Sequence, residues 1–396
     1  MLDAARSATS QRQGRPWPVL LMVRELGAGG SERQLTEIAR SLDRSRFEPH
    51  VGCFHPHGLR EEELRAAGVR IVRFPVRSFY APSTLLAAAA ARRYIRRHQI
   101  QLVHTFDTPS NLFGVPAARA GQARVVVSSQ RAYRSLAPGA HRHLLRITDR
   151  MVDAVVVNCE AMRRHLIEEE RVPAGLIHLC YNGIDTEKFH PQRSRRLPSL
   201  GGATLVIGAV SVLRREKALH TLLDAFAEVR SMQSGLKLAI VGSGPCRVSL
   251  EARARELGLG EDCVFEPATE QVVDWLHSID IFVLPSLSEA LSNSLMEAMA
   301  CGCAVAASRV GGNVELVKEG RTGMLFEAGA ADDLAAVLRV LIEGESLRQE
   351  LARAAARFIA QNFSVSAAAG RMGEIYAFLL GDFPAPGPAG RGTEAV

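Results

Sequence analysis

The sequence predicts an α/β protein with two domains, each built on a parallel β-sheet. Short apolar runs alternate with amphipathic helical segments along the chain, and this alternation is typical of strands joined by crossover helices. The pattern stops in a polar run at 191–202 and restarts at Thr204. With 396 residues, 47% of them hydrophobic, the chain can bury two cores of ordinary size. We therefore expect a linker at the polar run.

The first strand, 18–24, runs into a glycine-rich turn and a helix that continues through Leu42. Such a turn presents backbone N–H groups and a positive helix end to an anion. Gly29 and Gly30 are therefore candidates for a phosphate-binding loop, and a tight turn without a ligand is the alternative. A dinucleotide fingerprint needs a further glycine where Arg33 stands, so the pattern disfavours a nicotinamide dehydrogenase.

The rest of the first half repeats the same rhythm of strands and helices. We expect strands at 49–54, 69–74, 102–105, 125–129, 154–158 and 177–180. His104 lies on one strand, and Arg131 and Arg134 follow another. Arg131 is a candidate for binding an acceptor phosphate through charge-assisted hydrogen bonds, whereas a surface position without a ligand is the preferred interpretation for Arg134. His55 and His57 lack a third metal ligand nearby, so we interpret them as loop residues.

The second half begins with strand 204–210 and a basic phrase that ends in Lys217 and Ala218. Cations at a helix start oppose the helix dipole, so their placement favours an anionic ligand. Strand 237–241 leads into a second glycine turn with Gly242 and Gly244, and Pro245 is predicted as the first helical residue after it. Further elements are expected at 264–265, 271–278, 332–341 and 364–380.

One stretch, 281–312, contains a complete strand, loop, helix, strand and glycine turn. Ligands of open parallel sheets bind beyond the carboxyl ends of the strands, where this loop lies. Glu289 and Glu297 bracket the loop. Because Ser294 precedes Glu297 by three residues, a capping box is one interpretation of Glu297. Glu289 has no capping role that we can identify.

The spacing of Glu289 and Glu297, followed by Ala-Met-Ala-Cys-Gly, resembles the donor-binding signature of the retaining nucleotide-sugar glycosyltransferases of family 4. The phrases GAGGSERQ at 27–34 and NGIDTEKF at 182–189 also resemble that family. The resemblance covers Val19 to about Leu380. It implies the GT-B fold, in which two facing Rossmann-like domains enclose the active cleft.

The resemblance also assigns residues. It implies catalytic roles for Glu289 on the transferred sugar and for Lys217 on the donor diphosphate, and Arg214 is a catalytic candidate as the second cation on that diphosphate. Val212 stands where the family usually has an arginine. The implied donor-binding residues are Glu297, Ala290, Leu291, Ser292, Asn293, Ser294, Gly242 and Gly244. The implied acceptor or phosphate loop contains Gly29 and Gly30, and His104 and Arg131 are further candidates for it. The segment 128–131 stands where many members have a histidine.

The expected reaction transfers a hexose from a UDP-linked sugar, with retention, to a glycan or lipid-linked glycan acceptor in exopolysaccharide or cell-envelope synthesis. The chain has no Asp-x-Asp motif, so we expect neither a metal nor another cofactor. A sugar-nucleotide epimerase of the same fold is one alternative. A degenerate sugar-nucleotide sensor, suggested by Val212, is another.

Charge is uneven along the chain. Residues 1–190 carry 28 basic and 18 acidic side chains, whereas the remainder carries 20 and 24. The basic half favours an anionic partner such as a membrane surface. For Arg92, Arg93, Arg96 and Arg97, a solvated helix face and a membrane contact are equally good interpretations. We expect no nucleic-acid partner.

The seven cysteines show no paired spacing, which favours reduced thiols in a cytoplasmic protein. No stretch is long and apolar enough to span a membrane, so we expect a peripheral position at the inner face of the plasma membrane. The expected bounds are a disordered tail at 1–16, an acceptor-binding domain at 17–190, a linker at 191–202, a donor-binding domain at 203–362, a helix returning to the first domain at 363–381 and a disordered tail at 382–396.

Overall fold

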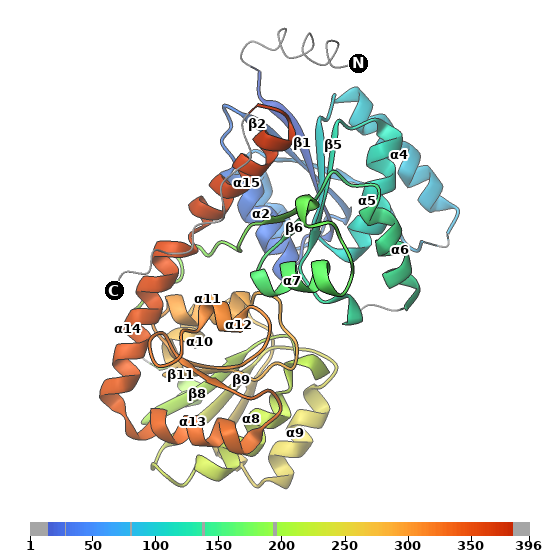
Figure 1. Cartoon of the computed structure of the whole chain (residues 1–396). Helices are drawn as coiled ribbons and strands as arrows, with labels where there is room; N and C mark the ends of the chain where they lie inside the picture. Colours follow the sequence, from blue (N-terminus) through green and yellow to red (C-terminus); the bar gives the residue numbers. More distant parts are fainter. Residues whose placement is uncertain (1–14, 28, 80, 137–138, 193–195, 383–396) are drawn as a thin grey trace. The chain divides into compact units, whose positions relative to one another are not determined.

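The computed structural model describes residues 15–382 except 28, 80, 137–138 and 193–195. The chain forms two compact units (Figure 1). Unit 1 comprises the described residues up to Asn158, together with Arg163–Gly183 and the segment from Val365 onward, and unit 2 comprises Cys159–Met162 and Ile184–Ser364. Apart from their innermost residues, the tails predicted at 1–16 and 382–396 lie outside the described residues.

Unit 1 is built on a seven-stranded parallel sheet with the strand order β3-β2-β1-β4-β5-β6-β7. Its strands are β1 (Trp17–Glu25), β2 (Phe47–His55), β3 (Arg70–Arg73), β4 (Leu102–Thr105), β5 (Val125–Gln130), β6 (Ala154–Val157) and β7 (Ile177–Leu179). The order reverses direction between β1 and β4, which lie side by side with Leu21 opposite His104. This is the switch point of a doubly wound sheet.

Helices cover both faces of the unit 1 sheet (Figure 1). They are α2 (Gly30–Ser41), α3 (Leu59–Ala66), α4 (Ser83–Arg97), α5 (Thr108–Gly121), α6 (Gly139–Asp149), α7 (Glu160–Glu168) and α15 (Val365–Leu379), with short 3-10 turns at Arg134–Leu136 and Ala174–Leu176. The last helix, α15, contributes Met372, Ile375 and Tyr376 to the same core as the strand residues Val19 and Leu21. The end of the chain is therefore a part of the first core.

Unit 2 is built on a six-stranded parallel sheet with the order β10-β9-β8-β11-β12-β13. Its strands are β8 (Leu205–Val210), β9 (Leu236–Val241), β10 (Cys263–Glu266), β11 (Ile281–Leu284), β12 (Ala304–Ser308) and β13 (Met324–Phe326). Its helices are α8 (Leu219–Val229), α9 (Arg247–Glu256), α10 (Val272–Ser278), α11 (Asn293–Ala300), α12 (Asn313–Leu316), α13 (Ala331–Glu343) and α14 (Glu345–Asn362), with 3-10 turns η3 (Pro198–Leu200), η4 (Arg215–Lys217) and η5 (Gly260–Asp262).

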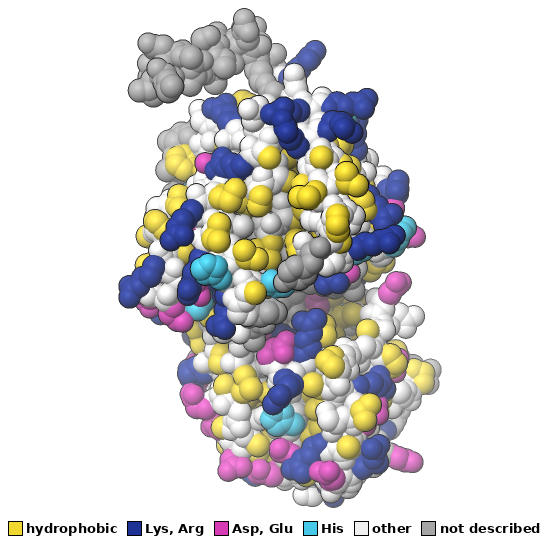
Figure 2. Space-filling model, turned by 90° about the vertical axis from the view of Figure 1, so that its right-hand side faces the viewer, with side chains coloured by type: hydrophobic (Ala, Val, Ile, Leu, Met, Phe, Trp, Pro, Cys, Tyr) yellow, Lys and Arg dark blue, Asp and Glu magenta, His cyan; other side chains and the backbone are white. Residues whose placement is uncertain are grey.

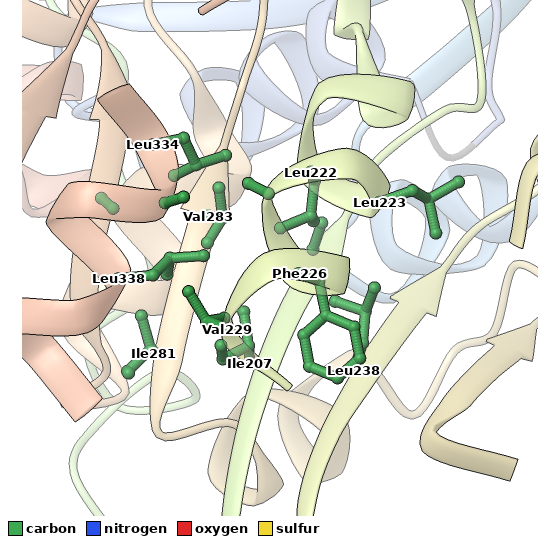
Figure 3. Packing of buried hydrophobic residues seen from close by; sticks show 14 of the residues in the cluster. Ile207, Leu222, Leu223, Phe226, Val229, Leu238, Ile281, Val283, Leu334 and Leu338 are labelled. Atoms are coloured by element: carbon green, nitrogen blue, oxygen red, sulfur yellow. The ribbon is translucent and has the colours of Figure 1, made fainter. Parts of the chain in front are cut away.

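The core of unit 2 forms where α8 and α13 pack side by side on the sheet (Figure 3). Leu222, Phe226 and Val229 recur on α8 at the spacing of one helix face, and all are fully buried. They meet the strand residues Ile207 and Leu238 in the same cluster. This burial fixes the carboxyl ends of the central strands, where the candidate residues lie.

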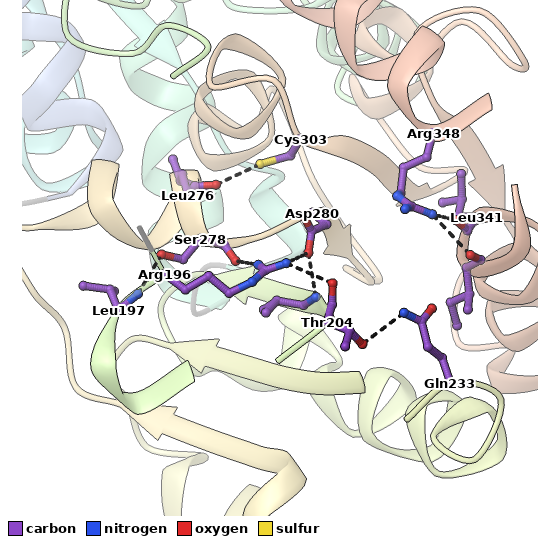
Figure 4. A network of polar contacts seen from close by, with 12 residues as sticks. Arg196, Leu197, Thr204, Gln233, Leu276, Ser278, Asp280, Cys303, Leu341 and Arg348 are labelled. Atoms are coloured by element: carbon purple, nitrogen blue, oxygen red, sulfur yellow. Dashed lines mark hydrogen bonds and ion pairs between the residues drawn. The ribbon is translucent and has the colours of Figure 1, made fainter. Parts of the chain in front are cut away.

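The end of the predicted linker is bound firmly to unit 2 through Arg196 (Figure 4). Its guanidinium donates to the Ser278 carbonyl oxygen and to a carboxylate oxygen of Asp280, each at 2.7 Å. The same Asp280 oxygen accepts the N–H of Val206, the second residue of β8. The segment therefore enters the sheet along a fixed path.

Three local predictions differ from the structure. Pro245 was predicted to open a helix, but it lies in a turn and α9 begins at Arg247, because the glycine turn continues past it. No strand was predicted at β13 and no helix at α14, and the structure has both. Among the described helices, none has the length and apolar character that crossing a membrane requires.

Candidate functional site

Most of the predicted residues of the second half gather beyond the carboxyl ends of the unit 2 strands. Lys217 follows β8, Gly242 and Gly244 follow β9, and Glu289 follows β11. Since β9, β8 and β11 are parallel neighbours in the sheet, their carboxyl ends share one edge. The fold thus brings together groups that are up to 72 residues apart in sequence, at the usual ligand position of such sheets.

Lys217 and Glu289 form an ion pair in this structure. The ammonium Nζ lies 2.5 Å from Oε2 of Glu289, and the two side chains are 20% and 13% exposed. The same carboxylate oxygen accepts the hydroxyl of Ser286 at 3.1 Å. The backbone N–H of Leu287 donates to the carbonyl oxygen of Glu216 at 2.8 Å, which ties the turn that carries Lys217 to the loop that carries Glu289.

A series of buried hydrogen bonds joins the loop that carries Glu289 to the end of β12 and the start of α12. The Ser308 hydroxyl donates to the carbonyl oxygen of Ser286 at 2.6 Å, and the side-chain amide of Asn313 donates to the carbonyl oxygen of Ser308 at 3.0 Å. All three side chains are fully buried. Buried hydrogen bonds of this kind restrain the loop that carries Glu289. The side-chain oxygen of Asn313 has no hydrogen-bond partner among the described residues, so these polar groups are only partly satisfied.

The loop before α11 is also held by the glycine turn that follows β12. The N–H of Gly312 donates to the carbonyl oxygen of Ala290 at 2.7 Å. A Cβ at Gly312 would lie directly against that same oxygen, so only glycine permits the contact. Ala290 and Leu291 are both buried, and any ligand contact of theirs would therefore come from the backbone.

Ser292 is the N-cap residue of α11, and its hydroxyl accepts the N–H of Leu295 at 3.3 Å. Ser294 lies inside the helix and bonds to the Ser292 hydroxyl, so the structure excludes the capping box that was one interpretation of Ser294 and Glu297. Glu297 is buried on the next turn of α11. Ser292, Asn293 and Ser294 consequently occupy the positive end of the helix, which favours negative charge.

The two glycines after β9 permit two turns to pack closely. Gly242 and Gly244 have φ values of +148° and +159°. A Cβ at Gly244 would lie 2.5 Å from the carbonyl oxygen of Leu213, and one at Gly242 would lie directly against that of Ser211. The glycines therefore bring the end of β9 against the segment that leads to Lys217.

The segment between β8 and α8 shows how this chain departs from the family pattern. Ala218 adopts a left-handed conformation with φ +45°, a conformation that glycine adopts readily and that costs other residues on the order of 1 kcal/mol. Arg214 is exposed, and its guanidinium lies 3.9 Å from a carboxylate oxygen of Glu216. The side chain of Val212 is exposed as well. Arg214 is therefore available to a ligand.

In unit 1, the glycine turn begins α2. Gly29 is the N-cap residue and Gly30 the first helical residue. The carboxylate of Glu32 lies against Gly29, so a Cβ at this position would collide with it. Burial raises the pKa of Glu32 to about 6, and the neighbouring carboxylate of Asp107 contributes to the rise. Ala28 lies outside the described residues.

Arg131, at the end of β5, is held without a neutralising carboxylate. Its guanidinium donates to the side-chain oxygen of Asn182 at 2.7 Å and lies 5.1 Å from the ring centroid of Phe106. Burial lowers the pKa of Arg131 to about 10. Within the described ranges, no carboxylate pairs with it. A half-buried cation without a carboxylate partner favours an anionic ligand.

Another predicted position of unit 1, His104, is built into its core. His104 is fully buried, and its ring nitrogens lie 2.7 Å from the Tyr376 hydroxyl and 2.9 Å from the Ser129 hydroxyl. Burial holds the pKa of His104 well below its usual value. The neutral imidazole therefore joins β4 to α15 instead of lying at an open acceptor loop.

The surface position predicted for Arg134 is wrong. Arg134 is almost fully buried and pairs with Asp149 at 2.8 Å and with Glu170 at 3.6 Å. Both acidic partners lie far along the chain, on or near other helices, so local sequence gave no sign of this burial.

No group of three or more potential metal ligands occurs among the residues that the structure describes. The supporting residues Ser286, Ser308 and Asn313 were not predicted from the sequence. Their only signal was position, since Ser308 is the last residue of β12 and Ser286 stands two residues after the end of β11.

Comparisons with known proteins agree with this geometry. The model of the family described as Glycosyl transferases group 1 matches residues 195–358, and that of Glycosyltransferase Family 4 matches residues 28–188. A Mycolicibacterium smegmatis protein named GDP-mannose-dependent alpha-(1-6)-phosphatidylinositol monomannoside mannosyltransferase is 32% identical over 69% of this chain and 74% of its own length. Sulfoquinovosyl transferase SQD2 of Arabidopsis thaliana is 28% identical over 54% of this chain and 42% of its own length.

Solved structures share the fold. Anabaena HepE in complex with UDP and glucose superposes with a TM-score of 0.79 at 22% identity, over 91% of this chain and 99% of that one. Both doubly wound parallel sheets are thus those of the GT-B fold. With the matches in both halves, the chain belongs to the family 4, group 1 glycosyltransferases, enzymes that transfer a sugar from a nucleotide sugar.

Proposed function

We propose that this protein transfers a hexose from a UDP-linked sugar to a lipid-linked glycan acceptor, with retention at the anomeric carbon. The observation that carries the proposal is the Lys217–Glu289 ion pair beside the positive end of α11. The relatives support a nucleotide-sugar donor, because one name contains GDP-mannose and one structure contains UDP and glucose. An experiment must therefore distinguish a UDP-linked donor from GDP-mannose.

We propose that the donor diphosphate binds between Lys217 and the first residues of α11. Lys217 is the cation of the ion pair with Glu289. Arg214, three residues earlier in the sequence, is a second cation and is exposed. Fixed cationic donors stabilise the negative charge that develops on the leaving phosphate. Glu289 would then accept hydroxyls of the transferred sugar, and Glu297 those of the ribose.

In this proposal, no side chain acts as a nucleophile. The leaving phosphate takes the proton of the attacking acceptor hydroxyl on the same face of the sugar, which retains the anomeric configuration. The new glycosidic bond forms as the bond to the phosphate breaks, and the nucleoside diphosphate leaves with the proton. Glu289 and Glu297 position the donor, and Lys217 with the helix end stabilises the departing charge.

We propose that an anionic acceptor group binds at Arg131. This guanidinium lacks a carboxylate partner among the described residues, and burial lowers its pKa to about 10. A phosphate or pyrophosphate would supply the missing charge through charge-assisted hydrogen bonds. The lipid named in the mycobacterial relative supports a lipid-linked acceptor. The proposed setting is envelope polysaccharide synthesis at the inner face of the plasma membrane, with the acceptor domain at 17–190 and the donor domain at 203–362.

The proposal is tested by incubating the protein with UDP-glucose, UDP-galactose or GDP-mannose and a lipid-linked acceptor extract. Release of nucleoside diphosphate is measured, and the product configuration is read from its anomeric proton signal. We expect release from one UDP-sugar, a retained configuration and loss of release in Glu289→Ala, while Glu343→Ala, an exposed residue at the end of α13, keeps it.

Three outcomes would contradict the proposal. Release from GDP-mannose alone would exclude a UDP-linked donor. Conversion of a sugar nucleotide into its epimer with no acceptor would favour the epimerase alternative. Binding of a donor with neither transfer nor epimerisation would favour the sensor.

A further inference from the structure

Helix α4 exposes two adjacent leucines in its first turn. Leu85 and Leu86 are 76% and 75% exposed, and Ala89 and Ala90 on the next turn are exposed too. The next two turns of the exposed side carry Arg92, Arg93, Arg96 and Arg97. The helix has no acidic residue. One side of α4 therefore changes from apolar to basic along its length.

Helix α6 continues this surface. Leu144 and Ile147 are large exposed side chains, and Arg142 and Arg150 are exposed beside them. Both α4 and α6 pack against α5. The rings of Phe79, which precedes α4, and of His141 on α6 meet with centroids 6.4 Å apart, so the two helices begin close together.

We define the α4–α6 face as the exposed residues Leu85, Leu86, Arg92, Arg93, Arg96, Arg97, Arg142, Leu144, Ile147 and Arg150. Figure 2 shows the side of unit 1 that carries α4 and α6, with hydrophobic side chains beside many Lys and Arg side chains. In the described part of the chain, the four arginines of α4 have no ion-pair partner. The face thus presents uncompensated positive charge next to unpartnered apolar side chains.

We propose that the α4–α6 face binds the surface of an anionic membrane, with the leucines inserted among the lipid headgroups and the arginines on headgroup phosphates. Lipid phosphates supply the charge that the arginines lack, and an amphipathic helix with basic and leucine-rich portions is the usual form of such a contact. Two copies of the chain that joined through this face would bring like charges together, so charge disfavours self-association. The inference rests on the proposed function in one respect, because it places the enzyme where a lipid-linked acceptor lies.

The experiment is flotation of the full chain with two kinds of vesicle, one of phosphatidylglycerol with phosphatidylcholine and one of phosphatidylcholine alone. We expect the protein to float with the anionic vesicles only, and added salt should weaken the binding because the charges are exposed. Leu85→Glu/Leu86→Glu should abolish flotation. Arg93→Gln/Arg97→Gln should lower the partition coefficient by about 25-fold, at roughly fivefold per arginine.

Unit 2 offers matched controls. Val248 on α9 is 75% exposed, so Val248→Glu adds a charge at an equally exposed apolar site. Arg353 and Arg357 on α14 are exposed four residues apart, like Arg93 and Arg97, and Arg353→Gln/Arg357→Gln removes the same charge. Both controls should float as the wild type does.

Three results would overturn the inference. Wild-type protein that ignores anionic vesicles excludes the contact, and equal losses in the α4 and control variants would show only a dependence on total charge. A wild-type dimer that Leu85→Glu/Leu86→Glu converts to monomer would assign the face to a second copy. Nucleotide binding is measured on the wild type and on every variant. If none of them binds a nucleotide, the proposed function is contradicted, but the flotation result still stands.

Discussion

Replacing Lys217 with alanine tests the paired arrangement at the carboxyl ends of the strands. Its ammonium lies 2.5 Å from Glu289, and both side chains are mostly buried. If Lys217 stabilises the departing phosphate, its loss should lower kcat by about 10²–10³-fold, which corresponds to about 2.7–4 kcal/mol of transition-state stabilisation. The KM for the donor should rise as well, because Lys217 also meets the charge that the bound diphosphate already carries.

The same substitution should also lower the free energy of unfolding. A charge-assisted hydrogen bond contributes about 1.5–3 kcal/mol, and without Lys217 the Glu289 carboxylate keeps only the hydroxyl of Ser286 from this set of contacts. Removing both charges in Lys217→Ala/Glu289→Ala should therefore cost less stability than the sum of the single changes, with a coupling of about 0.5–3 kcal/mol.

The assays are steady-state kinetics with the best donor and urea denaturation of each variant. Lys318→Ala, at an exposed lysine of unit 2, is the matched control and should behave as the wild type in both. A Lys217→Ala protein with wild-type kcat would refute the role in catalysis. Strict additivity of the two single changes in the urea experiment would refute the ion pair.

Further predictions concern stability. Gly244→Ala should lower the free energy of unfolding by about 1–3 kcal/mol, because the added Cβ meets the Leu213 carbonyl oxygen. Thermal melting measures this loss, and melting with added nucleotide should show that the variant binds nucleotide more weakly. Glu32→Gln tests the pKa raised to about 6. A carboxyl with a raised folded-state pKa holds its proton more tightly in the native state, so the native state loses stability as pH rises from about 4.5 to about 6. The variant should therefore gain up to about 2 kcal/mol over the wild type at pH 7 and nothing at pH 4 in urea denaturation, and equal effects at both pH values would contradict this. Tyr376→Phe removes the buried partner of His104 and should cost about 1–3 kcal/mol; an unchanged melting temperature would show that this hydrogen bond contributes nothing.

The sequence predicted most of the strands because their signal is local. The strands β4 (Leu102–Thr105) and β11 (Ile281–Leu284) have the bounds expected from their apolar runs. Helix α14 was missed because its buried positions, among them Leu351, Ala355 and Ile359, lie in an arginine- and alanine-rich segment with a weak apolar stripe. Strand β13 has three residues, too few for a periodic pattern.

The candidate site was harder to predict, because tertiary contacts decide what each side chain does. The resemblance pointed to Lys217 and Glu289, but not to their pairing or to Ser286 behind them. The burial of Arg134 depends on carboxylates at least 15 residues away. His104 likewise meets a tyrosine 272 residues later in the chain. Spacing along the chain contains none of this information.

The central claim, a nucleotide-sugar site in unit 2 that depends on Lys217, is tested most directly by a thermal-shift panel. The panel contains UDP, GDP, ADP, NAD and the corresponding nucleotide sugars, and it compares the wild type with Lys217→Ala, with and without chelator. A ligand at about a hundred times its Kd stabilises by about 2.7 kcal/mol. We predict that UDP and one UDP-sugar raise the wild-type melting temperature, that chelator has no effect, and that the variant does not respond. Stabilisation by NAD alone, or an equal response in the variant, would contradict the account.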